Sequence, residues 1–232
     1  MIEVRKLVKR FGLKNVLRGL DFDVQAGEFV ALLGPNGAGK TTFLRILASL
    51  SRPSLGQVSV AGYKLPAQAA AVRRRLGVVS HLPLLYGDLT AEENLQFYGR
   101  MYDLQNIEAR INDVLDMVGL SARRRDLVRT FSRGMQQRLA IGRAVLHDPD
   151  VMLFDEPYTG LDQDASEMLD EVLKNVAAAG RTVVMTSHDL ARAEDLATRF
   201  DVLSRGVIAA SASRVELENS NLLTFYKQAL AG

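Results

Sequence analysis

The chain has 232 residues, of which 47% are hydrophobic and 24% charged, a composition that excludes a disordered, collagen-like or wholly coiled-coil protein. Its formal net charge of +2 does not favour nucleic acid as a partner, and the absence of cysteine excludes disulfides and cysteine-based chemistry. No apolar run approaches the ~20 residues of a membrane-spanning helix, and the charged start is unlike a signal peptide. We therefore expect a chain that does not cross a membrane by itself but can dock onto a protein that does.

Three continuously apolar runs predict strands that are buried on both faces. They are residues 29–33, 151–154 and 182–185. Runs of this kind are typical of a parallel sheet that is covered by helices. Residues 20–24 and 57–60 instead alternate apolar and polar side chains, which predicts half-buried strands.

Between and after these strands the apolar residues follow helical spacing. A helix is expected directly after residue 39, and its core face would carry Phe43, Leu44, Leu47 and Leu50. Another is expected after Glu156, marked by Met168, Leu169, Val172, Leu173 and Val176. Residues 202–208 predict a hairpin around a central glycine. The alternation of strand and helix predicts an α/β core with a parallel sheet.

Residues 85–146 form a different region, which is expected to be helical without intervening strands. Thr90 and Glu93 match the capping-box pattern at a helix start. Ser132 is placed to N-cap a further helix that runs to about Leu146. A helical insert within an α/β fold is therefore the main architectural feature.

The strand at 29–33 leads into a phosphate-binding loop. Residues 34–41 match the pattern G-x-x-x-x-G-K-[ST] between a strand and a helix. The glycines let backbone amides turn toward phosphates, and the helix N-terminus adds a partial positive charge. Lys40 is expected to reach the β- and γ-phosphates, and the Thr41 hydroxyl to bind Mg²⁺. The candidate nucleotide-binding residues of this segment are Gly34, Pro35, Asn36, Gly37, Ala38, Gly39, Lys40, Thr41 and Thr42.

Four other residues carry groups suited to phosphate chemistry. Asp155 ends the strand at 151–154, where a Mg²⁺ ligand belongs, and Glu156 is placed to polarise an attacking water. His188 follows the strand at 182–185 and is placed to contact the γ-phosphate or that water. Ser132 and the amides after it are compatible with a second anion site and equally with plain helix capping.

In this order, the segments GPNGAGKT, FSRGMQQRLAIGRAV, VMLFDEPYTGLD and TSHD resemble the ATP-binding subunit of ABC transporters. Ser132 lies 92 residues after Lys40 and 23 before Asp155, as this resemblance requires. It implies an ABC-type P-loop NTPase in which a RecA-like α/β core carries an antiparallel β-subdomain and a helical subdomain with the signature. Residues 1–232 would form one ATPase domain, with 1–84 and 147–232 as core and β-subdomain and 85–146 as helical subdomain.

The resemblance also implies a head-to-tail homodimer that binds two ATP molecules with Mg²⁺ between its copies. Phe11 would stack on adenine, and residues 34–42 would hold phosphates and metal. Ser132 and Gly134 would contact the γ-phosphate across the interface, beside a D-loop that includes Gly160, Leu161 and Asp162. Glu156 would be the catalytic base and His188 the switch histidine.

Two positions depart from the family pattern. The signature is usually Leu-Ser-Gly-Gly-Gln, whereas this chain has Phe131-Ser132-Arg133-Gly134-Met135. Its serine and second glycine remain, so contact with the γ-phosphate is expected to survive. The glutamine of the family's Q-loop aligns with His81, which can still bind the metal and its water or transmit motion.

The resemblance implies an integral-membrane partner subunit, no nucleic acid, and a peripheral location at the cytoplasmic face of the membrane. Residues 81–95 and 225–230 are similar to the ATPase subunit of the bacterial haem exporter of cytochrome c maturation. The alternative is an ABC-2-type drug or polysaccharide exporter, whose ATPase subunits share the Arg133 signature variant. A soluble ABC ATPase of DNA repair needs a long coiled-coil insert, for which the 92 residues between Lys40 and Ser132 leave no space.

Overall fold

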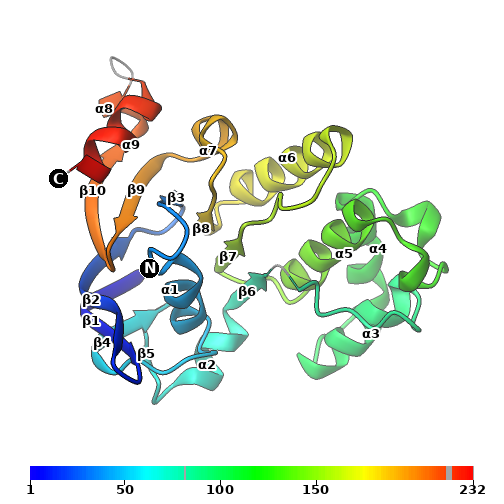
Figure 1. The fold of residues 1–232 in the computed structure, drawn as a ribbon. Helices are drawn as coiled ribbons and strands as arrows, with labels where there is room; N and C mark the ends of the chain where they lie inside the picture. Colours follow the sequence, from blue (N-terminus) through cyan, green and yellow to red (C-terminus); the bar gives the residue numbers. More distant parts are fainter. Residues whose placement is uncertain (81, 218–220, 232) are drawn as a thin grey trace.

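Two β-sheets carry the fold in the computed structural model, which describes residues 1–80, 82–217 and 221–231 (Figure 1). The smaller sheet is antiparallel and has the strand order β2-β1-β4-β5. Its strands are β1 (Ile2–Phe11), β2 (Lys14–Val24), β4 (Leu55–Val60) and β5 (Tyr63–Leu65). The half-buried strands predicted at 20–24 and 57–60 fall within β2 and β4 and are confirmed.

The larger sheet has the order β10-β9-β3-β8-β7-β6 and is parallel except for β10. Its strands are β3 (Phe29–Leu33), β6 (Leu76–Val79), β7 (Val151–Asp155), β8 (Thr182–Thr186), β9 (Arg199–Ser204) and β10 (Val207–Ser213). Every residue of β3, β7 and β8 is buried, which confirms the three apolar runs as interior parallel strands. β9 and β10 form the predicted hairpin.

The larger sheet separates two hydrophobic cores because successive side chains of a strand point to opposite faces. Val30 and Leu32 of β3 pack with α1 (Lys40–Leu47) and the smaller sheet. Ala31 and Leu33 belong to the other core, to which α6 (Gln163–Ala178) and α7 (Leu190–Leu196) also contribute. The sheet is therefore covered on both faces, and its carboxyl edge is left to the loops that follow the strands.

The helical region consists of α3 (Ala91–Met101), α4 (Ile107–Met117) and α5 (Arg133–Val145), with two short 3₁₀ turns, η1 (Ser121–Arg123) and η2 (Val128–Thr130), between α4 and α5. It lies to one side of the larger sheet, beyond β6 and β7 (Figure 1). The predicted capping box is present, since the Glu93 amide donates to the Thr90 hydroxyl at 3.1 Å and the Thr90 amide donates to the Glu93 carboxylate at 2.8 Å.

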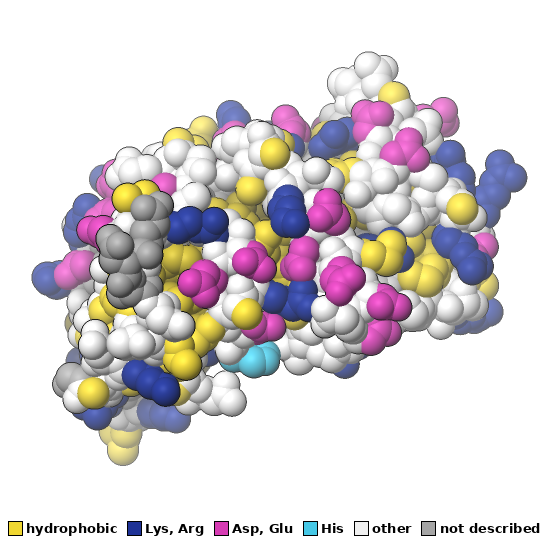
Figure 2. Space-filling view, turned by 90° about the horizontal axis from the view of Figure 1, so that it is seen from above, with side chains coloured by type: hydrophobic (Ala, Val, Ile, Leu, Met, Phe, Trp, Pro, Cys, Tyr) yellow, Lys and Arg dark blue, Asp and Glu magenta, His cyan; other side chains and the backbone are white. Residues whose placement is uncertain are grey.

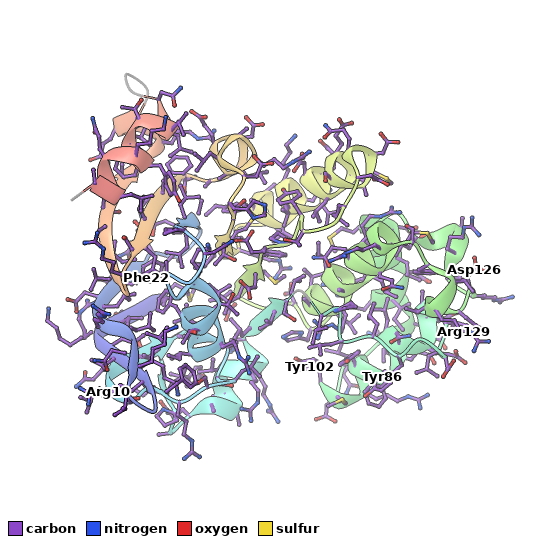
Figure 3. All side chains as sticks on the ribbon, in the orientation of Figure 1. Arg10, Phe22, Tyr86, Tyr102, Asp126 and Arg129 are labelled. Carbon is purple, nitrogen blue, oxygen red and sulfur yellow. The ribbon has the colours of Figure 1, made fainter. Side chains whose placement is uncertain are left out.

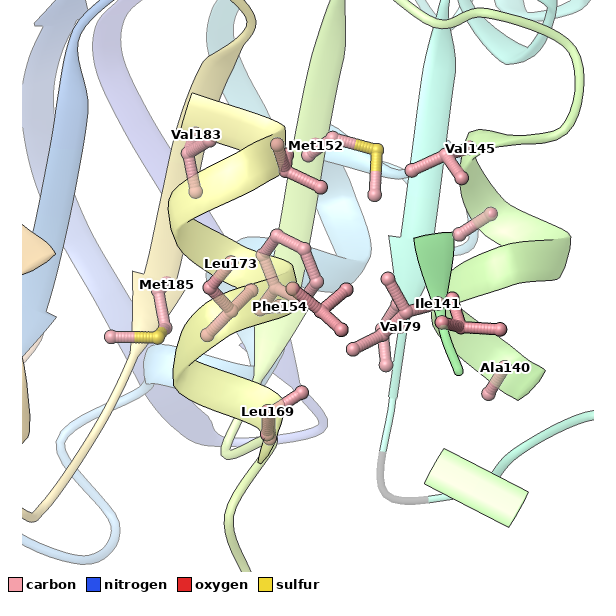
Figure 4. Close-up of a cluster of buried hydrophobic side chains, with 14 of the residues drawn as sticks. Val79, Ala140, Ile141, Val145, Met152, Phe154, Leu169, Leu173, Val183 and Met185 are labelled. Carbon is pink, nitrogen blue, oxygen red and sulfur yellow. The ribbon is translucent and has the colours of Figure 1, made fainter. Parts of the chain in front are cut away.

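Side chains from β6, β7, α5 and α6 join the helical region to the sheet in one apolar cluster. Figure 4 shows Phe154 of β7 between Leu173 of α6 and the group formed by Val79 and Ile141. The remaining helices are α2 (Ala69–Arg74), α8 (Arg214–Leu217) and α9 (Leu222–Ala231). Within the described ranges, the helices are all too short or too polar to traverse a bilayer.

Two expectations about individual core residues are wrong. Leu50 is 60% exposed because α1 ends at Leu47 and Ser49 takes a left-handed backbone conformation, φ +59°, that turns the chain away. Met168 is 46% exposed although its neighbour Leu169 is buried. Adjacent residues of a helix point about 100° apart, and Met168 lies on the side of Leu169 that is turned toward solvent.

Candidate functional site

The predicted phosphate-binding loop lies between β3 and α1, and its lysine side chain folds back onto the backbone of the loop. Lys40 is only 7% exposed, and its ammonium group donates to the Gly34 carbonyl at 2.7 Å. Gly34 and Gly39 both have positive φ, and a β-carbon at Gly39 would lie 2.9 Å from the Leu17 side chain. The backbone conformation and the packing therefore both require glycine there. The loop presents amides and one ammonium group to a polyphosphate.

A cluster of oxygen atoms lies beside this loop. Asp155 is the last residue of β7, and its Oδ1 accepts from the hydroxyls of Thr41 at 3.1 Å and Thr186 at 2.8 Å. Carboxylate and hydroxyl oxygens are the ligands that Mg²⁺ prefers. In the part of the chain that the structure describes, no three His, Cys, Asp or Glu side chains form a metal cage. A Mg²⁺ ion needs none, since it usually takes one or two protein oxygens together with substrate phosphates and water. Thr41 and Asp155 therefore fit the predicted metal.

Glu156 lies between the loop lysine and the predicted switch histidine. Its carboxylate is 3.6 Å from Lys40 Nζ and 2.6 Å from His188 Nδ1. Its backbone is in the left-handed region, φ +52°, which is unfavourable for a glutamate. The Glu156 amide donates to the Thr186 hydroxyl at 2.9 Å, which helps to hold this conformation. The fold thus brings together three groups that the sequence separates by up to 148 positions.

A cavity of about 810 Å³ joins these residues to the start of the chain. Phe11 lines it, is 55% exposed, and has the Lys9 ammonium 4.7 Å from its ring centre. The other predicted residues that line it are Pro35, Asn36, Gly37, Gly39, Lys40, Thr41, Thr42, Glu156 and His188. Of the remaining loop residues, Ala38 is buried and donates its amide to the Pro35 carbonyl at 3.2 Å. The predicted base-binding and phosphate-binding residues thus share one cavity.

The predicted signature and D-loop residues are elsewhere. Ser132 is exposed and accepts the Met135 amide as the N-cap of α5, at 3.2 Å. Asp162 is exposed and accepts the Ala165 amide as the N-cap of α6, at 2.8 Å. Gly134 is buried, and a β-carbon there would lie 2.6 Å from that of Ala165. Ser132, Gly134 and Asp162 are absent from the lining of the cavity, all three being described residues. His81 lies outside the described residues.

Sequence reasoning assigned no role to several residues of this site. Thr186 bonds both Asp155 and the Glu156 amide, and Lys14, Arg18 and Arg205 add positive charge to the cavity lining. A signal for Thr186 exists, because it ends a buried parallel strand next to β7 and such ends meet at one edge. The three cations come from the β1–β2 and β9–β10 hairpins. These hairpins are brought together only by the packing of the whole chain, so the local sequence carried no signal for the three residues.

Comparison with known proteins relates the whole chain to one family. Residues 17–159 match the family described as "ABC transporter". A linearmycin resistance ATP-binding protein of Bacillus subtilis is 36% identical over 94% of this chain and 70% of its own length. A Nod factor export ATP-binding protein I of Burkholderia lata is 41% identical over 94% of this chain and 73% of its own.

Solved structures agree with these sequence relatives. One described as the ATP binding subunit of an ABC transporter superposes with a TM-score of 0.88 at 32% identity and covers 99% of both chains. A second, described as an ATP-binding cassette dimer in a post-hydrolysis state bound to ADP and Pi, has a TM-score of 0.83 at 28% identity. It covers 92% of this chain and 99% of its own. The fold, the cavity and both kinds of relative lead to one conclusion: the chain belongs to the ABC transporter family, as an ATP-binding subunit that hydrolyses ATP.

Proposed function

We propose that this ATPase powers an exporter of the drug or polysaccharide type, acting through a separate membrane subunit. The support is the pair of relatives named for linearmycin resistance and Nod factor export, which match more than nine-tenths of this chain. These relatives favour the ABC-2-type alternative over the haem export that residues 81–95 and 225–230 suggested. The haem-export interpretation rests on two short segments, whereas the identity to the linearmycin and Nod factor relatives extends over 94% of the chain.

Hydrolysis is proposed to depend on Glu156. Its carboxylate, held between Lys40 Nζ at 3.6 Å and His188 Nδ1 at 2.6 Å, is the observation that carries the proposal. In that position it can accept a proton from a water whose oxygen attacks the γ-phosphorus. His188 would orient the carboxylate and the water. When ATP enters, Lys40 would exchange its contact with the Gly34 carbonyl for the β- and γ-phosphates.

The remaining roles in the cavity follow from the chemistry of each group. Phe11 offers an exposed aromatic face on which adenine can stack. Residues 34–42 would hold the phosphates through their amides. Thr41 and Asp155, with His81 by its place in the sequence, would hold Mg²⁺, which when bound neutralises charge on the phosphates.

A second copy of the chain is proposed to complete each site. Ser132, Gly134 and Asp162 would then meet the γ-phosphate bound by the partner copy, in a head-to-tail dimer. Their exposed or close-packed positions at the starts of α5 and α6 suit an interface. The solved relatives described as dimeric support the same assembly.

The division of labour between core and helical region is also a proposal. Residues 1–84 and 147–232 would act as one body and 85–146 as another. In support, β6 ends at Val79, β7 begins at Val151, and α3 to α5 lie between them in sequence. A relative movement of the two bodies would open and close the site.

The membrane subunit is proposed to dock beside α3, on the cytoplasmic face of the membrane. Leu84, Tyr86, Phe97 and Met101 are all at least 40% exposed in this region, and the rings of Tyr86 and Phe97 meet edge to face at 5.0 Å. Figure 3 shows Tyr86 and Tyr102 in the helical region. Exposed apolar clusters mark interaction sites, and His81 adjoins this segment in the sequence.

Glu156→Gln tests the hydrolytic part of the proposal. An amide cannot take the proton of the attacking water, so turnover should fall by about 1000-fold while ATP binding persists. The ATP-bound dimer should therefore persist and be detected by gel filtration in the presence of ATP. Glu171→Gln on the exposed face of α6 is the matched control. Normal turnover in the Glu156→Gln variant would contradict the role of Glu156.

Deletion of the gene tests the cargo. The mutant strain should become sensitive to an antibiotic or lose export of a saccharide conjugate, and its c-type cytochromes should mature normally. A deletion strain that lacks c-type cytochromes and keeps its drug resistance would restore the haem interpretation.

A further inference from the structure

Three side chains from separate segments meet behind the catalytic loops. The Tyr158 hydroxyl donates to Asp170 Oδ1 at 2.6 Å, and Arg192 Nη1 donates to Asp170 Oδ2 at 2.5 Å. The Arg192 guanidinium also lies over the Tyr158 ring, 5.1 Å from its centre. Tyr158 follows β7, Asp170 lies in α6 and Arg192 in α7. We call these residues the Tyr158–Asp170–Arg192 cluster.

The cluster is largely withdrawn from solvent. The Arg192 and Asp170 side chains are 17% and 22% exposed, and burial together with the neighbouring Asp170 raises the pKa of the Tyr158 phenol. Hydrogen bonds to ionised groups are strong and directional when screening is weak. Around the cluster, the face of the molecule over α6 and α7 mixes acidic and basic side chains (Figure 2).

Arg192 holds α7 at more than one point. It donates to the Gln163 side chain at 3.2 Å and lies 3.5 Å from the Asp189 carboxylate. Asp189 is the N-cap of α7 and directly follows His188 in the chain. Arg192 therefore ties the start of α7, and with it the histidine loop, to α6.

Tyr158 holds the other loop. It lies two residues after Glu156, whose left-handed backbone, φ +52°, needs support from its surroundings. Its bond to Asp170 fixes that loop to the same helix that anchors Arg192. The cluster is therefore a common anchor for the two loops whose tips meet in the 2.6 Å Glu156–His188 contact.

We propose that the Tyr158–Asp170–Arg192 cluster is a positioning device for the ATPase reaction. It keeps the Glu156 and His188 loops at the separation at which their side chains contact each other, and it touches neither nucleotide nor metal. The proposal rests on the roles proposed above for Glu156 and His188. A polar network suits this task because its hydrogen bonds specify one geometry, whereas apolar packing tolerates small shifts.

Tyr158→Phe is the sharpest test, since it removes one hydroxyl and leaves the ring beneath Arg192. We expect kcat for ATP hydrolysis to fall about tenfold, the effect of one strong hydrogen bond, with the KM for ATP unchanged. Tyr226→Phe, on half-buried α9, is the matched control and should keep both constants. A Tyr158→Phe enzyme with unchanged kcat, or with equal changes in KM and kcat, would overturn the proposal.

A second experiment separates positioning from general destabilisation. In a His188→Ala background the contact that the cluster supports is already lost, so adding Tyr158→Phe should lower kcat by less than twofold. A full tenfold loss in that background would mean that Tyr158 acts by another route. Arg192→Lys keeps the charge but loses the planar fork and the stacking, and it should lower kcat as Tyr158→Phe does. Melting temperatures are measured for every variant.

These results are distinguishable from failure of the proposed function. If Glu156→Gln and His188→Ala hydrolyse ATP normally, the catalytic roles of those residues are wrong. If both lose turnover and Tyr158→Phe retains it, only the positioning role of the cluster is wrong.

Discussion

The cavity at the carboxyl edge of the larger sheet and the starts of α5 and α6 differ in how their polar groups are used. At the cavity, Glu156 contacts Lys40 and His188, and the neighbouring Asp155 accepts from the Thr41 hydroxyl, although these residues come from three separate segments. At the helix starts, Ser132 and Asp162 cap their own helices and face solvent. The first region is assembled within one chain, whereas the second is exposed and is proposed to be completed by another copy of the chain.

Of the changes that compare the two regions, Lys40→Ala in the assembled region should have the largest effect on ATP binding. It removes the buried ammonium group that is proposed to face the β- and γ-phosphates, so ATP affinity should fall by at least about 100-fold. Titration with a fluorescent ATP analogue measures this. Lys174→Ala, on the exposed part of α6, serves as the control. Unchanged ATP affinity in the Lys40→Ala variant would show that this loop does not bind the phosphates of ATP.

Ser132→Arg tests the presented region. The bulky cation should obstruct contact with a partner copy and lower turnover by about 100-fold, a loss comparable to that of one transition-state donor. ATP affinity per chain should stay unchanged, because Ser132 is absent from the lining of the cavity. Ser121→Arg, in the same helical region, is the control. If the Ser132→Arg variant loses ATP binding instead, the two regions are not separate.

The pH dependence of stability tests the contact that His147, which follows α5, makes with Tyr102, which follows α3. Its ring stacks on Tyr102 with centres 3.8 Å apart, and burial lowers its pKa to about 4. The unfolded chain takes up the proton near the ordinary value of 6.5 and the folded chain does not. The contribution of neutral His147 to the free energy of unfolding is therefore fully present above pH 6.5. It is lost as the pH falls from 6.5 toward 4, and the loss is about 2 kcal/mol after allowance for partial exposure.

Urea unfolding of the wild type and of His147→Gln between pH 7 and pH 4 measures this decline. The variant should be less stable at pH 7 and should lose less stability on acidification. Equal slopes in the two proteins would show that His147 does not titrate as its burial implies.

Thr90→Ala should have the smallest effect, a loss of stability that is confined to the helical region. It removes the hydroxyl of the capping box at α3, which should cost about 1 kcal/mol of unfolding free energy. ATP affinity should be unaffected. The control Thr224→Ala is in α9. A change in ATP affinity from Thr90→Ala would mean that the helical region and the cavity are more tightly coupled than their contacts indicate.

The sequence by itself determined the local structure of this protein. Three apolar runs, the glycine-rich loop, the capping box and the cap at Ser132 all have the predicted form, since each depends on near neighbours and on side-chain periodicity. Leu50 and Met168 mark the limit of that reasoning, because helix length and rotation depend on packing. The family resemblance was also readable, because its segments are ordered and specifically spaced.

Tertiary structure alone decided which groups meet. The contact of Glu156 with Lys40 and His188, the part played by Thr186, and the cations Lys14, Arg18 and Arg205 in the cavity depend on strand order in the larger sheet and on the approach of two hairpins. The cluster of Tyr158, Asp170 and Arg192 arises in the same way, from three segments that pack against one another. Distances across a fold follow from packing of the whole chain, and no local pattern encodes them.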